Sequence, residues 1–201
     1  MVTGLEELAT TIVIPNILKL IDRAIDLVKI RKTRKRDYFE KVVDPLYKEF
    51  VPLGGNLLAL FRSAKESLRG TKRQRKTAFE MIQEQRDTFA GARAALRASA
   101  EKFGSVMSKK EPLLTAFVNS LASFFMPNAP SYVDRPMRSR AATLLEKYNM
   151  FEQSLDAAGR NPEYNKEQLE DFIAGATTDL EKAWYEIAGR YMELKLKYTV
   201  D

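Results

Sequence analysis

Cysteine and histidine are both absent from this sequence of 201 residues, and each absence removes several kinds of chemistry. Without cysteine there are no disulfide bonds, no thiolate metal ligands and no cysteine nucleophile. Without histidine there is no Ser-His-Asp or Cys-His catalytic arrangement, no imidazole metal site and no Glu-x-x-His motif of helical di-iron proteins. An enzyme built from this sequence would depend on carboxylates, Lys, Tyr, Ser or Mg²⁺.

The patterns of a secretory signal and of a membrane-spanning helix are also missing. Glu6 and Glu7 precede the first apolar stretch, where a signal peptide carries positive charge. The longest uncharged stretch, residues 112–133, contains Pro127 and Pro130 and several polar residues, so it is a poor spanning helix. We expect a cytoplasmic protein, with peripheral association with a membrane as an alternative.

Apolar residues recur at steps of three and four along most of the chain, which is the period of an amphipathic helix, and no strand-like alternation occurs. With 45% hydrophobic and 30% charged residues, the chain has the balance of a globular domain, and we expect residues 1–201 to form a single one. The predicted fold class is all-α, an antiparallel bundle of about five to six helices, several of them long, with a Pro-kinked second helix. The helical patterns cover residues 5–28 (divided by Pro15), 39–64, 71–103, 114–125, 137–155 and 161–194.

The second of these patterns contains a conflict between hydrophobic phase and backbone chemistry. Its apolar stripe keeps one phase from Phe39 to Ala64, which favours one continuous, kinked helix. Proline and glycine disfavour a helix interior by about 3 and 1 kcal/mol, so the run Pro52–Gly55 favours two helices, with Asn56 capping the second. We favour the single kinked helix, and two helices are the alternative.

Three other patterns carry local signals. Thr71 and Gln74 have the spacing of a capping box, and Gly104 is a plausible end for the helix that follows. The segment 114–125 is apolar on nearly all faces, so we expect it to be the most buried helix. The last helix is expected to reach about 30 residues, or roughly 45 Å.

Two basic clusters are the sharpest local features. Six of the eight residues at 29–36 are basic, and a second cluster opens the helix predicted from residue 71. The helix dipole favours cations at the end of a helix, which accounts for the first cluster, but it disfavours cations at a helix start, where the second lies. The candidate polyanion-binding residues are Lys29, Arg31, Lys32, Arg34, Lys35, Arg36, Lys72, Arg73, Arg75 and Lys76.

Motifs for metal or nucleotide chemistry are weak. Glu80, Glu84 and Asp87 share a helix face, but no Glu-x-x-Glu precedes Glu84-x-x-Asp87, so the paired motif of all-α nucleotide pyrophosphatases is incomplete. Gly54-Gly55 is not followed by the Gly-Lys-Ser/Thr of a phosphate-binding loop. We therefore expect no cofactor, no metal and no small-molecule substrate.

Three functions are consistent with these features. The leading hypothesis is a non-enzymatic helical interaction or scaffold protein that binds a protein partner or self-associates through a long helix face. The alternative is a polyanion binder that uses clusters 29–36 and 72–76 on nucleic acid or an anionic membrane surface. A Mg²⁺-dependent enzyme is third. One continuous second helix would place the two clusters near 50 Å apart, whereas a reversal at Pro52–Gly55 would bring them to one end.

Overall fold

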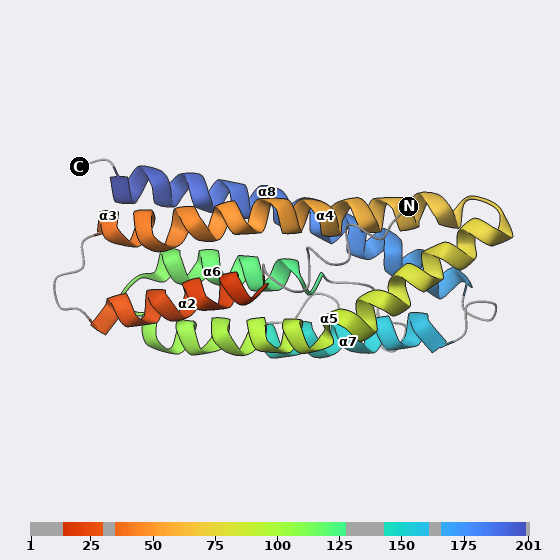
Figure 1. Cartoon of the computed structure of the whole chain (residues 1–201), viewed down its shortest axis with the longest axis horizontal. Coiled ribbons are helices and arrows are strands. Elements are labelled where there is room, and N and C mark those ends of the chain that lie inside the picture. Colours follow the sequence, from red (N-terminus) through yellow and green to blue (C-terminus); the bar gives the residue numbers. More distant parts are fainter. Residues whose placement is uncertain (1–13, 30–34, 128–142, 161–165, 200–201) are drawn as a thin grey trace.

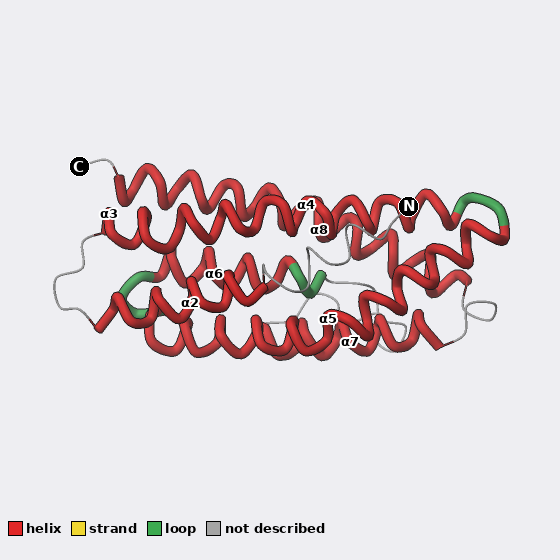
Figure 2. Tube along the Cα trace, viewed as in Figure 1, coloured by secondary structure: helices red, strands yellow, loops and turns green. Residues whose placement is uncertain are grey.

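The computed structural model describes residues 14–29, 35–127, 143–160 and 166–199. Every regular element within these ranges is helical (Figure 2), which confirms the all-α class for this part of the chain. The described residues form seven α-helices and one π-helical turn, slightly more than the expected five to six helices. The elements are α2 (Ile14–Lys29), α3 (Lys35–Tyr38), η2 (Phe39–Val43), α4 (Asp44–Leu68), α5 (Lys72–Met107), α6 (Pro112–Phe124), α7 (Leu144–Arg160) and α8 (Lys166–Thr199).

The longer helices extend along the long axis of the molecule (Figure 1). α4 and α8 pack side by side although they are far apart in the sequence. α5 is the central element, because it contacts α2, α4, α6 and α7, while α6 also packs against α8. The C-terminal end of α8 lies beside α3. This arrangement buries one continuous apolar core that draws on every helix.

The second helical pattern does not turn back at its breaker cluster. α3, η2 and α4 follow one another without interruption from Lys35 to Leu68, and Pro52, Gly54 and Gly55 all lie inside α4. The preference for one helix over two is therefore right. The chain reverses only after Leu68, in the short connection before α5.

The π-helical turn lies immediately before another breaker, Pro45. In η2 the backbone N–H of Asp44 donates to the carbonyl of Phe39, five residues earlier. A proline ring crowds the carbonyl four residues before it and supplies no N–H donor. The wider π turn gives the backbone room at this point, so the helical path continues through Pro45 into α4.

Gly54 is inside α4 because an aromatic ring occupies the space beside it. A Cβ atom added at Gly54 would lie 2.8 Å from the Phe50 ring and 3.0 Å from the Trp184 ring of α8. Phe50 is fully buried and packs edge-on against Phe124, with ring centroids 4.9 Å apart. The glycine therefore lets α8 approach α4 closely, and burial of these aromatic rings offsets the low helix propensity of the site.

The capping box at the start of α5 is present as predicted. The Thr71 backbone N–H donates to Gln74 Oε1 at 2.7 Å, and the Gln74 N–H donates to Thr71 Oγ1 at 3.4 Å. The predicted end at Gly104 is wrong, because α5 continues to Met107. Gly104 does not adopt a positive φ, and the buried side chains of Phe103 and Met107 extend the apolar stripe past it.

The remaining helices follow their patterns with shifted ends. α6 has buried residues along most of its length, as expected. α7 begins at Leu144, whereas the predicted segment 137–142 lies outside the described residues. α8 has 34 residues, somewhat more than the 30 expected.

Candidate interaction surfaces

The first basic cluster falls only partly within the described residues. Arg31, Lys32 and Arg34 lie outside them, and Lys29 is the last residue of α2. Lys35 and Arg36 open α3 and are exposed. The Arg36 guanidinium pairs with Glu40 at 2.8 Å, one turn further along. At least one cation of this cluster therefore has a neighbouring carboxylate within the fold.

The second basic cluster occupies the first turn of α5. Lys72, Arg73 and Lys76 are exposed, and Arg75 is half-buried. The Arg75 guanidinium donates to the Gly70 carbonyl at 2.8 Å and so closes the connection between α4 and α5. Lys76 lies 3.7 Å from Glu80, at the long end of ion-pair distances, and both side chains are mostly exposed. These cations face solvent at a helix start, where the dipole does not favour them.

The two clusters lie at opposite ends of the molecule. Lys35 and Arg36 start α3 at the end where α8 finishes, whereas Lys72–Lys76 starts α5 at the far end, after the full length of α4 (Figure 1). The unbroken helix from Lys35 to Leu68 separates them. The structure therefore does not bring the described residues of the two clusters together on one surface.

A second kind of surface appears on α8, where large apolar side chains face solvent. The exposed fractions are 76% for Tyr185, 50% for Met192 and 64% for Leu196. These positions, with the exposed Gly189, recur at steps of four, three and four, so they form one strip along the helix. A Cβ placed on Gly189 would meet no atom within 4 Å, which leaves a shallow gap in the middle of the strip. We call Tyr185, Gly189, Met192 and Leu196 the α8 strip.

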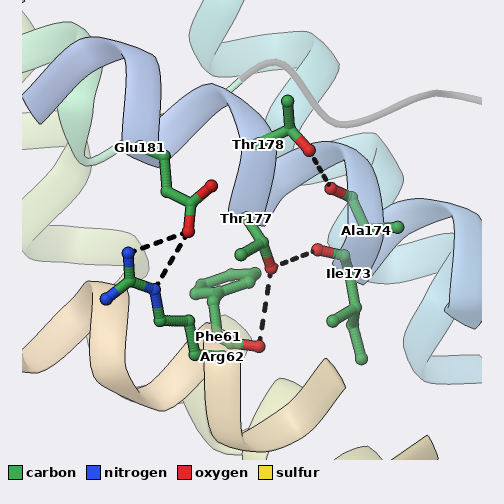
Figure 3. Close-up of polar contacts among 7 residues, drawn as sticks. All are labelled: Phe61, Arg62, Ile173, Ala174, Thr177, Thr178 and Glu181. Atoms are coloured by element: carbon green, nitrogen blue, oxygen red, sulfur yellow. Dashed lines mark hydrogen bonds and ion pairs between the residues drawn. The ribbon is translucent and has the colours of Figure 1, made fainter. Parts of the chain in front are cut away.

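Polar contacts between α4 and α8 hold the middle of α8 in place. Arg62 donates two hydrogen bonds to Glu181 Oε1, at 2.8 and 3.0 Å. The buried Thr177 hydroxyl donates to the Ile173 carbonyl at 2.6 Å and lies 3.5 Å from the Phe61 carbonyl on α4 (Figure 3). These contacts fix the rotation of α8 about its axis, with the α8 strip exposed to solvent.

Two tyrosines of α8 secure its C-terminal half. Tyr191 stacks on Tyr47 with centroids 4.0 Å apart and donates to Asp44 at 2.9 Å. The hydrogen bond from Lys48 is the largest influence that lowers the pKa of Asp44, and the Tyr191 hydroxyl lowers it further. Burial raises the pKa of Tyr191 above its ordinary value, as does the Asp44 carboxylate. At neutral pH, Asp44 is therefore ionised and Tyr191 beside it is neutral.

Tyr198 makes the same kind of contact at the start of α6. Its hydroxyl donates to the carboxylate of Glu111, and the tyrosine is 5% exposed. Burial raises the pKa of Tyr198 far above its ordinary value, and the Glu111 carboxylate raises it further. This contact joins the last turn of α8 to α6 and keeps the strip on a fixed helix.

The interface of α5 with α7 contains a buried cation. Arg93 is 3% exposed, pairs with Glu152 at 2.7 Å and lies 5.3 Å from the centroid of the Phe151 ring. One turn later, Arg97 lies 5.4 Å from the Tyr148 ring. These contacts are structural, because the Arg93 side chain is enclosed between two helices.

The described residues hold no group of three or more Asp or Glu side chains placed to bind a metal ion. None of the helices in this part of the chain is long and apolar enough to cross a membrane.

The α8 strip was not identified from the sequence, although a signal for it was present. The apolar pattern that predicts this helix runs through Trp184, Ile187, Tyr191 and Leu194. Tyr185, Met192 and Leu196 form a second apolar series on the same helix, displaced in angle from the first. Because only one of the two apolar series can face the core, the other stays exposed to solvent.

Comparison with protein-family models, with curated proteins and with solved structures finds no match to this chain.

Proposed function

We propose that this protein is a non-enzymatic helical interaction protein that self-associates through the outer face of α8, its helices packed as an antiparallel bundle with a kinked α4. The observation that carries the proposal is the α8 strip. Three large apolar side chains, each at least half exposed, line one face of a helix that is fixed by its contacts to α4 and α6. Apolar patches of this kind on a rigid element mark interaction sites.

The spacing of the α8 strip is self-complementary when a second copy runs antiparallel. Tyr185 then faces Leu196 of the second copy, and Gly189 faces Met192, since the strip reads the same from either end. The methionine side chain enters the gap left by the glycine, twice in a twofold dimer. A surface that matches itself in this way favours a second copy of the chain over an unrelated partner.

Charges beside the strip suit the same pairing. Glu186, Arg190, Glu193 and Lys197 alternate in sign along one flank of α8. In the antiparallel register, Arg190 lies within about one helical turn of Glu193 of the second copy, and Glu186 lies equally near Lys197. Within the chain, Arg190 already pairs with Glu186 at 2.7 Å, so these side chains are directed along this flank.

The first test is the oligomeric state in solution, measured by size-exclusion chromatography with light scattering over a range of concentrations. Met192→Glu places two carboxylates opposite the two glycine gaps, so we expect the wild-type dimer to dissociate. Val106→Glu is the matched control, because Val106 on α5 is 39% exposed and lies outside the strip. A wild-type chain that stays monomeric at the highest concentration refutes the proposal.

The second test addresses the register. The native chain has no cysteine, so single introduced thiols are unambiguous reporters. We expect Tyr185→Cys protein to form disulfide-linked dimers when mixed with Leu196→Cys protein, and neither variant to do so alone, because like positions would lie about 16 Å apart along the helix axis. Efficient linkage of each variant to itself would instead indicate parallel helices and would contradict the antiparallel pairing.

A further inference from the structure

The reversal between α4 and α5 is the most basic part of the described structure. Residues 65–76, which we call the hairpin tip, contain six basic residues and one acidic residue. They comprise the last turn of α4, the connection and the first turn of α5, and they form one end of the molecule (Figure 1). The basic residues are Lys65, Arg69, Lys72, Arg73, Arg75 and Lys76.

Two exposed arginines of the hairpin tip differ from the paired arginines elsewhere in the structure. Arg62, Arg93 and Arg190 each pair with a carboxylate at 2.7 to 2.8 Å. Among the described residues, no carboxylate lies within ion-pair distance of the Arg69 or Arg73 side chains, and both are exposed. The charges of Arg69 and Arg73 are therefore directed to solvent and are not neutralised by a neighbouring carboxylate.

Helix stability accounts for Lys65 and Arg69, which lie at the C-terminal end of α4, but not for the basic residues that open α5. Lys72, Arg73 and Lys76 lie in the first turns of α5, where the partial positive charge of the helix end repels cations. Thr71 and Gln74 already cap this end, so the basic residues are not needed as caps. An external anion would gain from the helix end and from the side chains together.

The shape and composition of the tip favour a lipid surface over a nucleic acid. The tip is the turn between two helices at one end of the molecule (Figure 1), and residues 65–76 contain no aromatic ring for stacking on bases. Its apolar residue Leu68 is 6% exposed, so attachment to any partner depends on charge. A rigid duplex meets such a turn at few of its fixed phosphates. Anionic lipids diffuse laterally and can gather around a compact basic cluster. We propose that the hairpin tip docks the molecule, end-on and reversibly, on bilayer surfaces that contain anionic lipid.

The test uses the full chain and vesicles of stated composition. Binding is measured by co-sedimentation with phosphatidylcholine vesicles and with vesicles in which 30% of the lipid is phosphatidylserine, a fraction chosen on the order of that in anionic membranes. Arg69→Glu/Arg73→Glu reverses two exposed charges at the tip. Lys109→Glu/Lys110→Glu is the matched control: it makes the same change of net charge at two exposed lysines between α5 and α6, at the other end of the molecule (Figure 1).

We expect the wild type to bind the phosphatidylserine vesicles and not the neutral ones, and its affinity to fall as salt is raised. The tip variant should lose at least about tenfold in affinity, whereas the control variant should stay within about threefold of the wild type. Circular dichroism and melting curves show whether each variant keeps the wild-type fold. Equal losses in the two variants, or no dependence on phosphatidylserine, would overturn the proposal. Tighter binding to duplex DNA than to these vesicles at the same salt would also overturn it and would identify nucleic acid as the partner.

Discussion

Replacing either of two adjacent glycines in α4 by alanine should change the free energy of unfolding in opposite directions. Alanine at Gly54 would bring its Cβ to 2.8 Å from the Phe50 ring and 3.0 Å from the Trp184 ring. Phe50 has little freedom to move, because it is 1% exposed and is surrounded by Phe124, Phe125 and Trp184. At Gly55 the same Cβ would have its nearest neighbour, Trp184 Cη2, at 4.0 Å, which is an ordinary contact.

The magnitudes follow from two opposing effects. Replacing glycine by alanine inside a helix stabilises it by about 1 kcal/mol, and forcing a methyl group into a packed core destabilises by about 1–3 kcal/mol. Gly54→Ala should therefore lower the free energy of unfolding by up to about 2 kcal/mol. Gly55→Ala has only the favourable effect and should raise it by about 1 kcal/mol. For a chain of this size, 1 kcal/mol corresponds to about 2–4 °C in Tm.

The assay is thermal and urea unfolding of both variants and the wild type, followed by circular dichroism at 222 nm, with a protein concentration held constant. The order of stability should be Gly55→Ala, wild type, Gly54→Ala. If Gly54→Ala proves as stable as Gly55→Ala, the close approach of α8 to α4 at Trp184 is not the reason for the glycine, and the reasoning is refuted.

Two further predictions concern buried polar groups. Arg93→Ala should lower the free energy of unfolding in urea by about 3 kcal/mol, because it leaves Glu152 unpaired between α5 and α7. Lys102→Ala, which removes an exposed ion pair, should change it by about 0.5 kcal/mol or less. Similar losses in the two variants would contradict this prediction. The pKa of Tyr198 is raised in the folded state, so its contribution to stability is complete below its unfolded pKa near 10 and declines as pH rises further. Unfolding measured from pH 8 to 11 should therefore show a weaker alkaline loss in Tyr198→Phe than in the wild type, and no such change in Tyr185→Phe, whose hydroxyl is exposed. If the stability of Tyr198→Phe falls with pH as steeply as that of the wild type, the contact of Tyr198 with Glu111 does not stabilise the neutral tyrosine.

Much of the local structure follows from sequence periodicity and end signals. The steps of three and four between apolar residues predict helices because only that period places them on one face. The capping box of Thr71 and Gln74 locates the start of α5, since it is a local pairing of side chains with the backbone. Helix ends without such a pairing were less predictable. α5 passes Gly104 because Phe103 and Met107 are held by other helices.

The candidate surfaces were also predictable only in part from the sequence. The basic residues of the hairpin tip are evident from their order in the chain, and the cluster 29–36 is equally plain. Their separation is not, because it depends on whether the helix continues through Pro52–Gly55. The α8 strip was missed because an apolar side chain in a sequence does not indicate which of two faces the core will cover.

The sequence by itself determined that the chain is helical where it is described, that it lacks cysteine and histidine chemistry, and that its cations are clustered. Composition and helical period express these properties locally, within a few turns. The tertiary structure decided that α4 is continuous, that the hairpin tip faces away from α3, and that Tyr185, Met192 and Leu196 stay exposed. These outcomes depend on which helices pack together. The fit of Trp184 against Gly54 offsets the unfavourable backbone of α4, and the contacts of α8 with α4 and α6 leave one of its apolar series in solvent.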